Sequence, residues 1–190
     1  MSKVIYDISM SLDGFITAAG QTAAEPLGVG GDQLHEWAFG GSDTDRSFLN
    51  DGAAGCGAVI SGRKNYDDAV PFWGPDGPMQ RTPVFVLTHE APASSPEGGV
   101  YTFVTDGPEE ALAQARRAAG DKDVYVMGGA QTGAAFLEAG LLDEIGIHLV
   151  PVLLGSGTPL FDSLGHHVRL ESLDAVQTPS ATHLRYRVAG

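Results

Sequence analysis

Residues 124–140, VYVMGGAQTGAAFLEAG, combine the signals of a buried strand, a glycine turn and a helix in direct succession. The first four residues are an apolar run typical of a strand covered on both faces. The glycine pair at 128–129 ends this run, and residues 130–139 then carry apolar side chains at helical spacing up to Gly140. Such a helix start suits an anion, because its unpaired backbone N–H groups and the helix dipole both favour negative charge. Taken alone, the stretch favours a plain tight turn over an anion site.

Length and composition indicate a soluble globular protein with one domain, which we place at residues 1–190. No apolar run is long enough to cross a bilayer, and no apolar leader follows Met1, so the expected location is cytoplasmic. The net charge of −13 argues against nucleic acid and anionic membranes as partners. Cys56 is the single cysteine, which excludes an internal disulfide and favours a buried structural thiol over a nucleophile.

Two further strand-to-helix turns carry polar groups suited to phosphate. The strand expected at 57–61 runs into Gly62-Arg63-Lys64-Asn65-Tyr66, where bare backbone and a guanidinium fork follow each other. The strand expected at 84–87 ends at Thr88-His89-Glu90, which offers a hydroxyl and a ring N–H. In open α/β sheets, ligands bind beyond the carboxyl ends of the strands. A solvated basic pair and an exposed loop histidine remain the alternatives.

The rest of the chain predicts scaffold. Alternating polarity in HLRYRV indicates a closing antiparallel hairpin, and capping signals mark a helix after Asp106. Pro and Gly at 68–83 predict a loop. The remaining strands are expected at 4–10, 100–104, 145–152, 166–176 and 182–188, and the remaining helices at 32–40, 43–54 and 106–119.

The run GGAQTGAAFLEAGLLDEIGIHLVPVLLGSGTPLF, residues 128–161, resembles the C-terminal half of the dihydrofolate reductase-like family. The closest branch is similar to the reductase domain of bacterial riboflavin biosynthesis and its free-standing relatives. The resemblance covers nearly the whole chain, more loosely at 17–54. It implies a three-layer α/β fold with a mixed, mostly parallel central sheet, flanking helices and a C-terminal antiparallel hairpin. It also implies a homodimer, with residues 151–155 and the hairpin at the interface.

The resemblance implies NADPH as the cofactor. SLDGFI, residues 11–16, is similar to the family's first loop, which passes over the nicotinamide, and the pair at 128–129 is expected to contain a cis peptide. The residues expected to bind the cofactor are Ile8, Ser9, Ile16, Gly62, Arg63, Lys64, Asn65, Leu87, Thr88, His89, Met127, Gly128, Gly129, Ala130, Gln131 and Thr132.

The proton donor and the substrate contacts are less closely defined. Dihydrofolate reductases place a carboxylate on the helix expected at 32–40, where this chain has Leu34 at the matching position and Asp32 and Glu36 nearby. These two acids are the catalytic candidates, with a helix cap for Asp32 and a solvated face for Glu36 as alternatives. Asp13, Trp37 and Phe39 are the substrate candidates, and both aromatic residues also suit a core. We predict no metal site, since His166 and His167 lack ligand spacing.

The combined pattern predicts an NADP-dependent oxidoreductase that passes hydride to a small heterocycle. Its substrate would be a pyrimidine or pterin-like ring or a ribosylamino derivative, as for 5-amino-6-(5-phosphoribosylamino)uracil reductase. The first strand offers Asp7 where that enzyme would use a base to hold the substrate phosphate. A non-catalytic nucleotide-binding protein and a genuine dihydrofolate reductase are the alternatives.

Overall fold

The computed structural model describes residues 2–162 and 164–189. The chain divides into two compact units, each built from two separate segments. Unit 1 consists of Met1–Tyr6 with Gly55–Leu142, and unit 2 consists of Asp7–Ala54 with Asp143–Gly190. Within the described ranges, no helix is long and apolar enough to cross a membrane.

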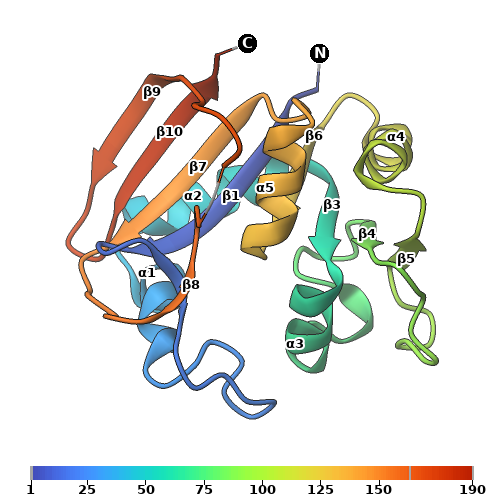
Figure 1. Ribbon diagram of the computed structural model, residues 1–190, viewed down its shortest axis with the longest axis horizontal. Helices are drawn as coiled ribbons and strands as arrows, with labels where there is room; N and C mark the ends of the chain where they lie inside the picture. Colours follow the sequence, from blue (N-terminus) through green and yellow to red (C-terminus); the bar gives the residue numbers. More distant parts are fainter. Residues whose placement is uncertain (1, 163, 190) are drawn as a thin grey trace. The chain divides into compact units, whose positions relative to one another are not determined.

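Unit 1 is a parallel sheet with helical connections (Figure 1). β3 pairs in parallel with both β4 and β6, and β4 pairs in parallel with β5. Ser61 of β3 lies opposite Val86 of β4 and Met127 of β6, so these three strands end at the same edge. The elements of this unit, in chain order, are β3 (Cys56–Gly62), α3 (Arg63–Trp73), η2 (Gly74–Asp76), β4 (Val84–Leu87), β5 (Tyr101–Val104), α4 (Pro108–Ala119), β6 (Asp123–Met127) and α5 (Ala130–Glu138).

The prediction of a loop at 68–83 is wrong in its first part, because α3 continues to Trp73 with Pro71 inside the helix. Proline lacks the N–H that would bond back to the residue 67 carbonyl, and α3 continues for only two residues beyond it. The helix ends at Gly74, whose φ of 57° and N–H to the Val70 carbonyl close the final turn. Glycine therefore supplies the stop that the proline signal suggested.

Cys56 lies in the hydrophobic core of unit 1, beside Ile5, Val59 and Tyr125. Burial raises the pKa of its thiol to about 11, and only 3% of the residue is exposed. We therefore expect iodoacetamide to leave Cys56 unmodified in the native protein at a pH of about 8 and to modify it fully after unfolding in guanidinium. Mass spectrometry measures the modified fraction, and rapid alkylation of the folded chain would contradict the buried assignment.

Unit 2 contains the antiparallel part of the fold. β10 pairs antiparallel with both β7 and β9, which confirms the predicted closing hairpin, although its first strand begins at Leu170 and not at residue 166. Leu34, Trp37, Val150 and Ala181 form its hydrophobic core. Its elements are β1 (Val4–Ser11) from Asp7 onward, β2 (Phe15–Ala18), η1 (Gly31–His35), α1 (Glu36–Gly40), α2 (Asp43–Gly55, whose last residue belongs to unit 1), β7 (Glu144–Val150), β8 (Gly157–Pro159), β9 (Leu170–Gln177) and β10 (Thr182–Val188).

The strands form one eight-stranded sheet in the order β5-β4-β3-β6-β1-β7-β10-β9, and β2 pairs with β8 in a small second sheet. The main sheet is parallel over β3–β6 and antiparallel at the β7, β10 and β9 end. The predicted class, α/β with a mixed, mostly parallel sheet and a C-terminal antiparallel hairpin, is confirmed.

Candidate functional site

Three loops of unit 1 follow β3, β4 and β6, and we call residues 61–66, 87–90 and 127–132 the phosphate-side loops. The Arg63 guanidinium joins the first two loops, since its Nη1 donates to the Glu90 carbonyl at 2.7 Å and lies 3.5 Å from Thr88 Oγ1. Asn65 joins the first and third, because its Nδ2 lies 2.9 Å from Ser61 Oγ and 3.4 Å from the Met127 carbonyl oxygen. The predicted cofactor residues of unit 1 are thus brought together at one edge of the sheet.

Glycines allow the backbone of these loops to pass close to side chains of the neighbouring loops. Gly128 and Gly129 have φ angles of 69° and 80°, a region that side chains disfavour. A Cβ at Gly128 would collide with the Asn65 amide, and one at Gly62 would collide with Thr132 Oγ1. The expectation of a cis peptide here is wrong: every peptide bond of the described residues is trans, and two left-handed glycines make the turn instead.

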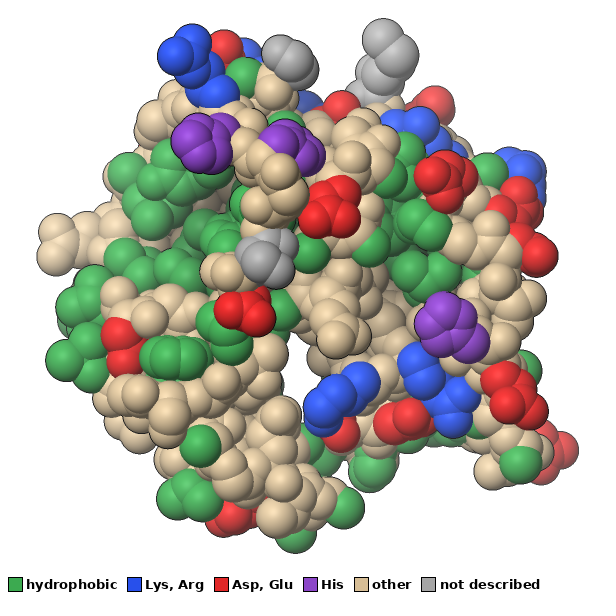
Figure 2. Space-filling model, in the orientation of Figure 1, with side chains coloured by type: hydrophobic (Ala, Val, Ile, Leu, Met, Phe, Trp, Pro, Cys, Tyr) green, Lys and Arg blue, Asp and Glu red, His purple; other side chains and the backbone are tan. Residues whose placement is uncertain are grey.

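Basic and acidic side chains form ion pairs beside these loops. Arg63 Nε lies 2.9 Å from both carboxylate oxygens of Asp67, and Lys64 Nζ lies 2.7 Å from Asp68, one helical turn along α3. Figure 2 shows basic side chains near a histidine, with acidic groups between them, over the region of α3. His89 is exposed. A phosphate arriving here would compete with Asp67 for Arg63, so part of the binding free energy would be spent on breaking that ion pair.

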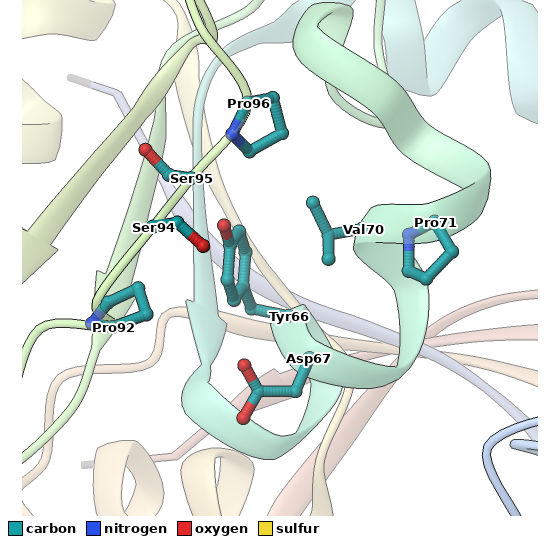
Figure 3. A pocket seen from close by; sticks show the side chains of 8 residues that line it. All are labelled: Tyr66, Asp67, Val70, Pro71, Pro92, Ser94, Ser95 and Pro96. Carbon is teal, nitrogen blue, oxygen red and sulfur yellow. The ribbon is translucent and has the colours of Figure 1, made fainter.

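A cavity of about 330 Å³ adjoins this region between α3 and the segment at 92–96 (Figure 3). Asp67 lines it and also binds Arg63, so the cavity lies next to the first phosphate-side loop. Its lining combines polar and apolar side chains and is formed by Tyr66, Asp67, Val70, Pro71, Pro92, Ser94, Ser95 and Pro96.

The first loop of unit 2 is held by one carboxylate. The Asp13 carboxylate accepts a hydrogen bond from the Ser11 hydroxyl at 2.6 Å. It also accepts hydrogen bonds from the backbone N–H groups of Leu154 and Gly155, at 3.1 and 2.7 Å. The Ser11 hydrogen bond, and then those from the backbone, hold the pKa of this carboxyl below its usual value. The structure thus engages Asp13, a predicted substrate contact, in fixing the loop that borders the expected nicotinamide position.

The predicted catalytic and substrate side chains of residues 32–39 are divided between the surface and the core. Asp32 and Glu36 are both exposed, and Asp32 does not cap its helix, which begins at Gly31 after a left-handed Gly30. Phe39 is 90% exposed, so its interpretation as a core residue is wrong. Because α1 has only five residues, it presents a single buried side chain, Trp37, for which the core interpretation is confirmed.

Unit 2 contains a buried chain of acids and imidazoles that the sequence patterns missed, and we call Asp7, His148, His183 and Asp45 the histidine–aspartate network. Asp7 Oδ1 lies 3.0 Å from His148 Nε2, the two Nδ1 atoms lie 2.7 Å apart, and His183 Nε2 lies 2.8 Å from Asp45 Oδ1. The two histidines are cross-strand partners on β7 and β10, which places both rings on one face.

Aromatic rings enclose this network. Trp37 lies over His148 with ring centroids 4.0 Å apart, and Phe48 stacks on His183 at 4.2 Å. The Trp37 indole N–H donates to Ser9 Oγ at 2.9 Å, so the same side chain touches the network and a residue expected beside the nicotinamide. This contact lies wholly within unit 2.

Asp45 closes the inner end of the network. Burial of Asp45 works against its charge, but hydrogen bonds from Ser42, Thr178 and His183 outweigh it and hold the pKa well below the usual range. Burial also lowers the pKa of His183, so this ring favours the neutral form. Ser42 and Asp45 form a capping box at the start of α2, and this S-x-x-D spacing was a sequence signal for Asp45.

Comparison with known proteins places this geometry in a family. The chain is 30% identical over 184 residues to the uncharacterized protein YwjB of Bacillus subtilis (strain 168), covering 97% of each chain. It is similar to a solved structure from Shewanella sp. PV-4, named provisionally as a riboflavin biosynthesis protein, with a TM-score of 0.73, 26% identity and 99% of each chain covered. It also shares its fold with a dihydrofolate reductase from Enterococcus faecalis complexed with NADP(H), with a TM-score of 0.64, 16% identity and coverage of 99% and 97%. Residues 2–184 match the model of the RibD C-terminal domain, and the chain belongs to that family.

Proposed function

We propose that this protein is an NADPH-dependent reductase that transfers hydride to a pyrimidine or pterin-like heterocycle or its ribosylamino derivative. The observation that carries the proposal is the direct linkage of the three phosphate-side loops through Arg63 and Asn65. The family is named for a riboflavin-pathway protein, which supports reductase chemistry of that type. Cytoplasmic location and a homodimer with Leu153 at its interface, a side chain that is 69% exposed, belong to the same proposal.

The phosphate-side loops fit a dinucleotide phosphate chain. The bare backbone at Gly128 and Gly129 precedes α5, so phosphate oxygens can approach the N–H groups of the helix start. Arg63 and Thr88 then suit the adenosine 2′-phosphate, by charge and by hydroxyl donation. The cofactor supplies the hydride chemistry when bound.

The residues expected at the nicotinamide lie in unit 2. Ile8, Ser9 and Ile16 belong to β1 and β2, and Ile16 is buried, so the loop between these strands is anchored on both sides. Together with the loop fixed by Asp13, these residues would orient the ring and keep water away from it.

Arg63→Ala tests the cofactor assignment. We expect it to weaken NADPH binding by about 10- to 100-fold, because one charge-assisted contact to phosphate is worth about 1.5–3 kcal/mol. NADH lacks the 2′-phosphate, so its affinity is expected to stay within about twofold. Fluorescence titration of both nucleotides measures the effect. Arg117→Ala on α4 is the control, since that exposed side chain pairs only loosely with Glu110, at 3.4 Å.

Turnover separates the reductase from a protein that only binds nucleotide. NADPH oxidation would be followed by the absorbance of the reduced nicotinamide, with 5-amino-6-(5-phosphoribosylamino)uracil, its dephosphorylated form and dihydrofolate as acceptors. The proposal expects oxidation with an aminouracil. Tight NADPH binding without oxidation of any acceptor would establish the non-catalytic alternative, and oxidation with dihydrofolate alone would establish a dihydrofolate reductase.

A further inference from the structure

The histidine–aspartate network has a definite proton count. Each of its three contacts, at 3.0, 2.7 and 2.8 Å, needs one hydrogen between two heavy atoms. If both carboxylates are ionised, all three hydrogens sit on the four imidazole nitrogens, one more than two neutral rings carry. A fourth hydrogen on the two rings would put two hydrogens between the Nδ1 atoms of His148 and His183. These atoms lie only 2.7 Å apart, which leaves room for one. The fully bonded network therefore stores one proton.

We infer that Asp7 is the acid of the reaction proposed above, and that His148, His183 and Asp45 are positioning residues that keep one proton ready for it. This inference rests on the proposed function for its substrate, although the stored proton can be detected without any substrate. It assigns the proton donor to β1 and β7, and not to the exposed Asp32 or Glu36 of the 32–40 segment.

The network opens to solvent at one end only. The side chains of Asp7 and His148 are 25% and 10% exposed, whereas those of Asp45 and His183 are 0% and 2% exposed. A proton can therefore leave and return at the Asp7–His148 end, where Asp7 is the more exposed of the two groups. Gly146, the neighbour of Asp7 on β7, leaves room for its carboxylate, because a Cβ there would collide with Asp7 Oδ2.

This outlet lies beside the expected hydride position. Asp7 and Ser9 are two residues apart on β1, so their side chains share a face of the strand. Trp37 provides a second connection between the network and Ser9, because it contacts the ring of His148 and its indole N–H donates to Ser9 Oγ. The proton outlet and the residue expected at the nicotinamide are thus neighbours within unit 2.

The proton balance of the step is simple. Before the reaction, His148 Nε2 passes its proton to Asp7 Oδ1, and His148 remains neutral with its Nδ1–H directed at His183. When hydride reaches a C=N or C=O carbon of the substrate, the π electron pair moves to the nitrogen or oxygen, which takes the proton from Asp7. The substrate thus gains a hydride from the cofactor and one proton from Asp7, a two-electron reduction. Asp7 is left ionised, with two ring protons for three contacts, and a proton from water restores the network.

The surrounding charges agree with a proton stored toward the Asp7 end. His183 has a pKa lowered by burial, which favours a neutral ring at the inner end of the network. His35 of η1 also has a lowered pKa, caused first by its own burial and then by the positive charge of His148, with Asp32 acting in the opposite direction. Within the described part of the chain, the buried Nδ1 of His35 has no hydrogen-bond partner, so His35 adds no proton to the network.

The stored proton is tested first on the cofactor-free protein. In ¹⁵N-histidine-labelled protein at neutral pH, we expect NMR to find three ring protons shared by His148 and His183. His183→Gln assigns the signals, and His166→Gln, an exposed loop histidine, is the matched control that leaves them unchanged. Two neutral imidazoles with two protons in total would overturn the inference, whatever the protein's catalytic activity.

The delivery of the proton is tested by single-turnover kinetics with NADPH and 5-amino-6-(5-phosphoribosylamino)uracil. Asp7→Asn keeps the size of the side chain but cannot release a proton, so we expect the rate to fall by about 100- to 1,000-fold. NADPH affinity should stay within about twofold, which separates this loss from a failure of cofactor binding. Asp174→Asn on exposed β9 is the control.

The pH dependence distinguishes delivery from a structural effect. The wild-type rate should fall as rising pH removes the stored proton, and the residual rate of Asp7→Asn should lose that dependence. His148→Gln is the second variant, in case Asp7→Asn does not fold, and is expected to shift the pH profile and to lower the rate. A wild-type rate in either folded variant would overturn the role of Asp7. If the wild-type protein binds no NADPH, the proposed function fails, while the proton count measured by NMR stands.

Discussion

Asp45→Ala is expected to lower the free energy of unfolding by about 3–5 kcal/mol, the range for breaking a buried charge cluster by removing one partner. The Asp45 carboxylate is fully buried and accepts from the Ser42 N–H and hydroxyl at 2.6 Å each, from Thr178 at 2.7 Å and from His183 at 2.8 Å. Its loss leaves the Ser42 and His183 donors without this acceptor and removes half of the cap of α2. Urea unfolding followed by circular dichroism measures the change.

The matched control is Asp43→Ala, two residues earlier, whose side chain is 97% exposed and pairs with Arg46 on the surface. We expect a change in the free energy of unfolding within about 0.5 kcal/mol, as for other exposed ion pairs.

The lowered pKa of Asp45 also makes its contribution to stability depend on pH. A depressed carboxyl pKa stabilises the folded state above the unfolded value of about 3.9, so the gap between wild type and Asp45→Ala should narrow as pH falls below it. Equal stabilities of Asp45→Ala and Asp43→Ala at neutral pH would contradict a stabilising role of the network.

Gly133→Ala is expected to destabilise unit 1 by about 3 kcal/mol, the upper end of the range for overpacking. Alanine is normally favoured over glycine inside a helix. At position 133 of α5, however, a Cβ would overlap the ring of Tyr6, which is only 1% exposed. The ring has little freedom to move, since the Tyr6 hydroxyl lies 3.3 Å from the Gly129 carbonyl oxygen. Thermal and urea unfolding measure the loss.

Gly55→Ala provides the contrast, because a Cβ at that position of α2 meets nothing within 4 Å. We expect it to be neutral or to raise stability by up to about 1 kcal/mol. The double variant Tyr6→Leu with Gly133→Ala should be more stable than the sum of the single changes predicts, since the smaller side chain removes the overlap. Strict additivity would show that the Tyr6 ring is not the cause.

The phosphate-side loops were predictable because their signals are local. Gly62 and Gly128 each follow an apolar strand, and the sequence shows both the strand end and the turn. Parallel pairing of β3 with β4 and β6 then carries the three turns to one edge, which the fold resemblance implied. The role of these residues in cofactor binding remains a prediction until nucleotide affinities are measured.

The histidine–aspartate network could not be predicted in the same way, because it depends on pairings between distant residues. Asp7 and His148 are 141 positions apart, and His183 and Asp45 are 138 apart. Each residue lies in a stretch with its own local explanation, so neither periodicity nor motif spacing connects the four. The two imidazoles are brought together by the register of β10 on β7, which becomes visible only in three dimensions.

The interleaved make-up of the two units has a consequence for how the chain matures on the ribosome. Unit 1 has all of its residues once position 142 has been synthesised, with 7–54 as an excursion between its parts. Unit 2 must wait for 143–190, which supply both imidazoles facing Asp7 and Asp45. Nascent chains that stall before this last segment should therefore display a protease-resistant parallel core while the acidic partners of the missing rings are still unprotected.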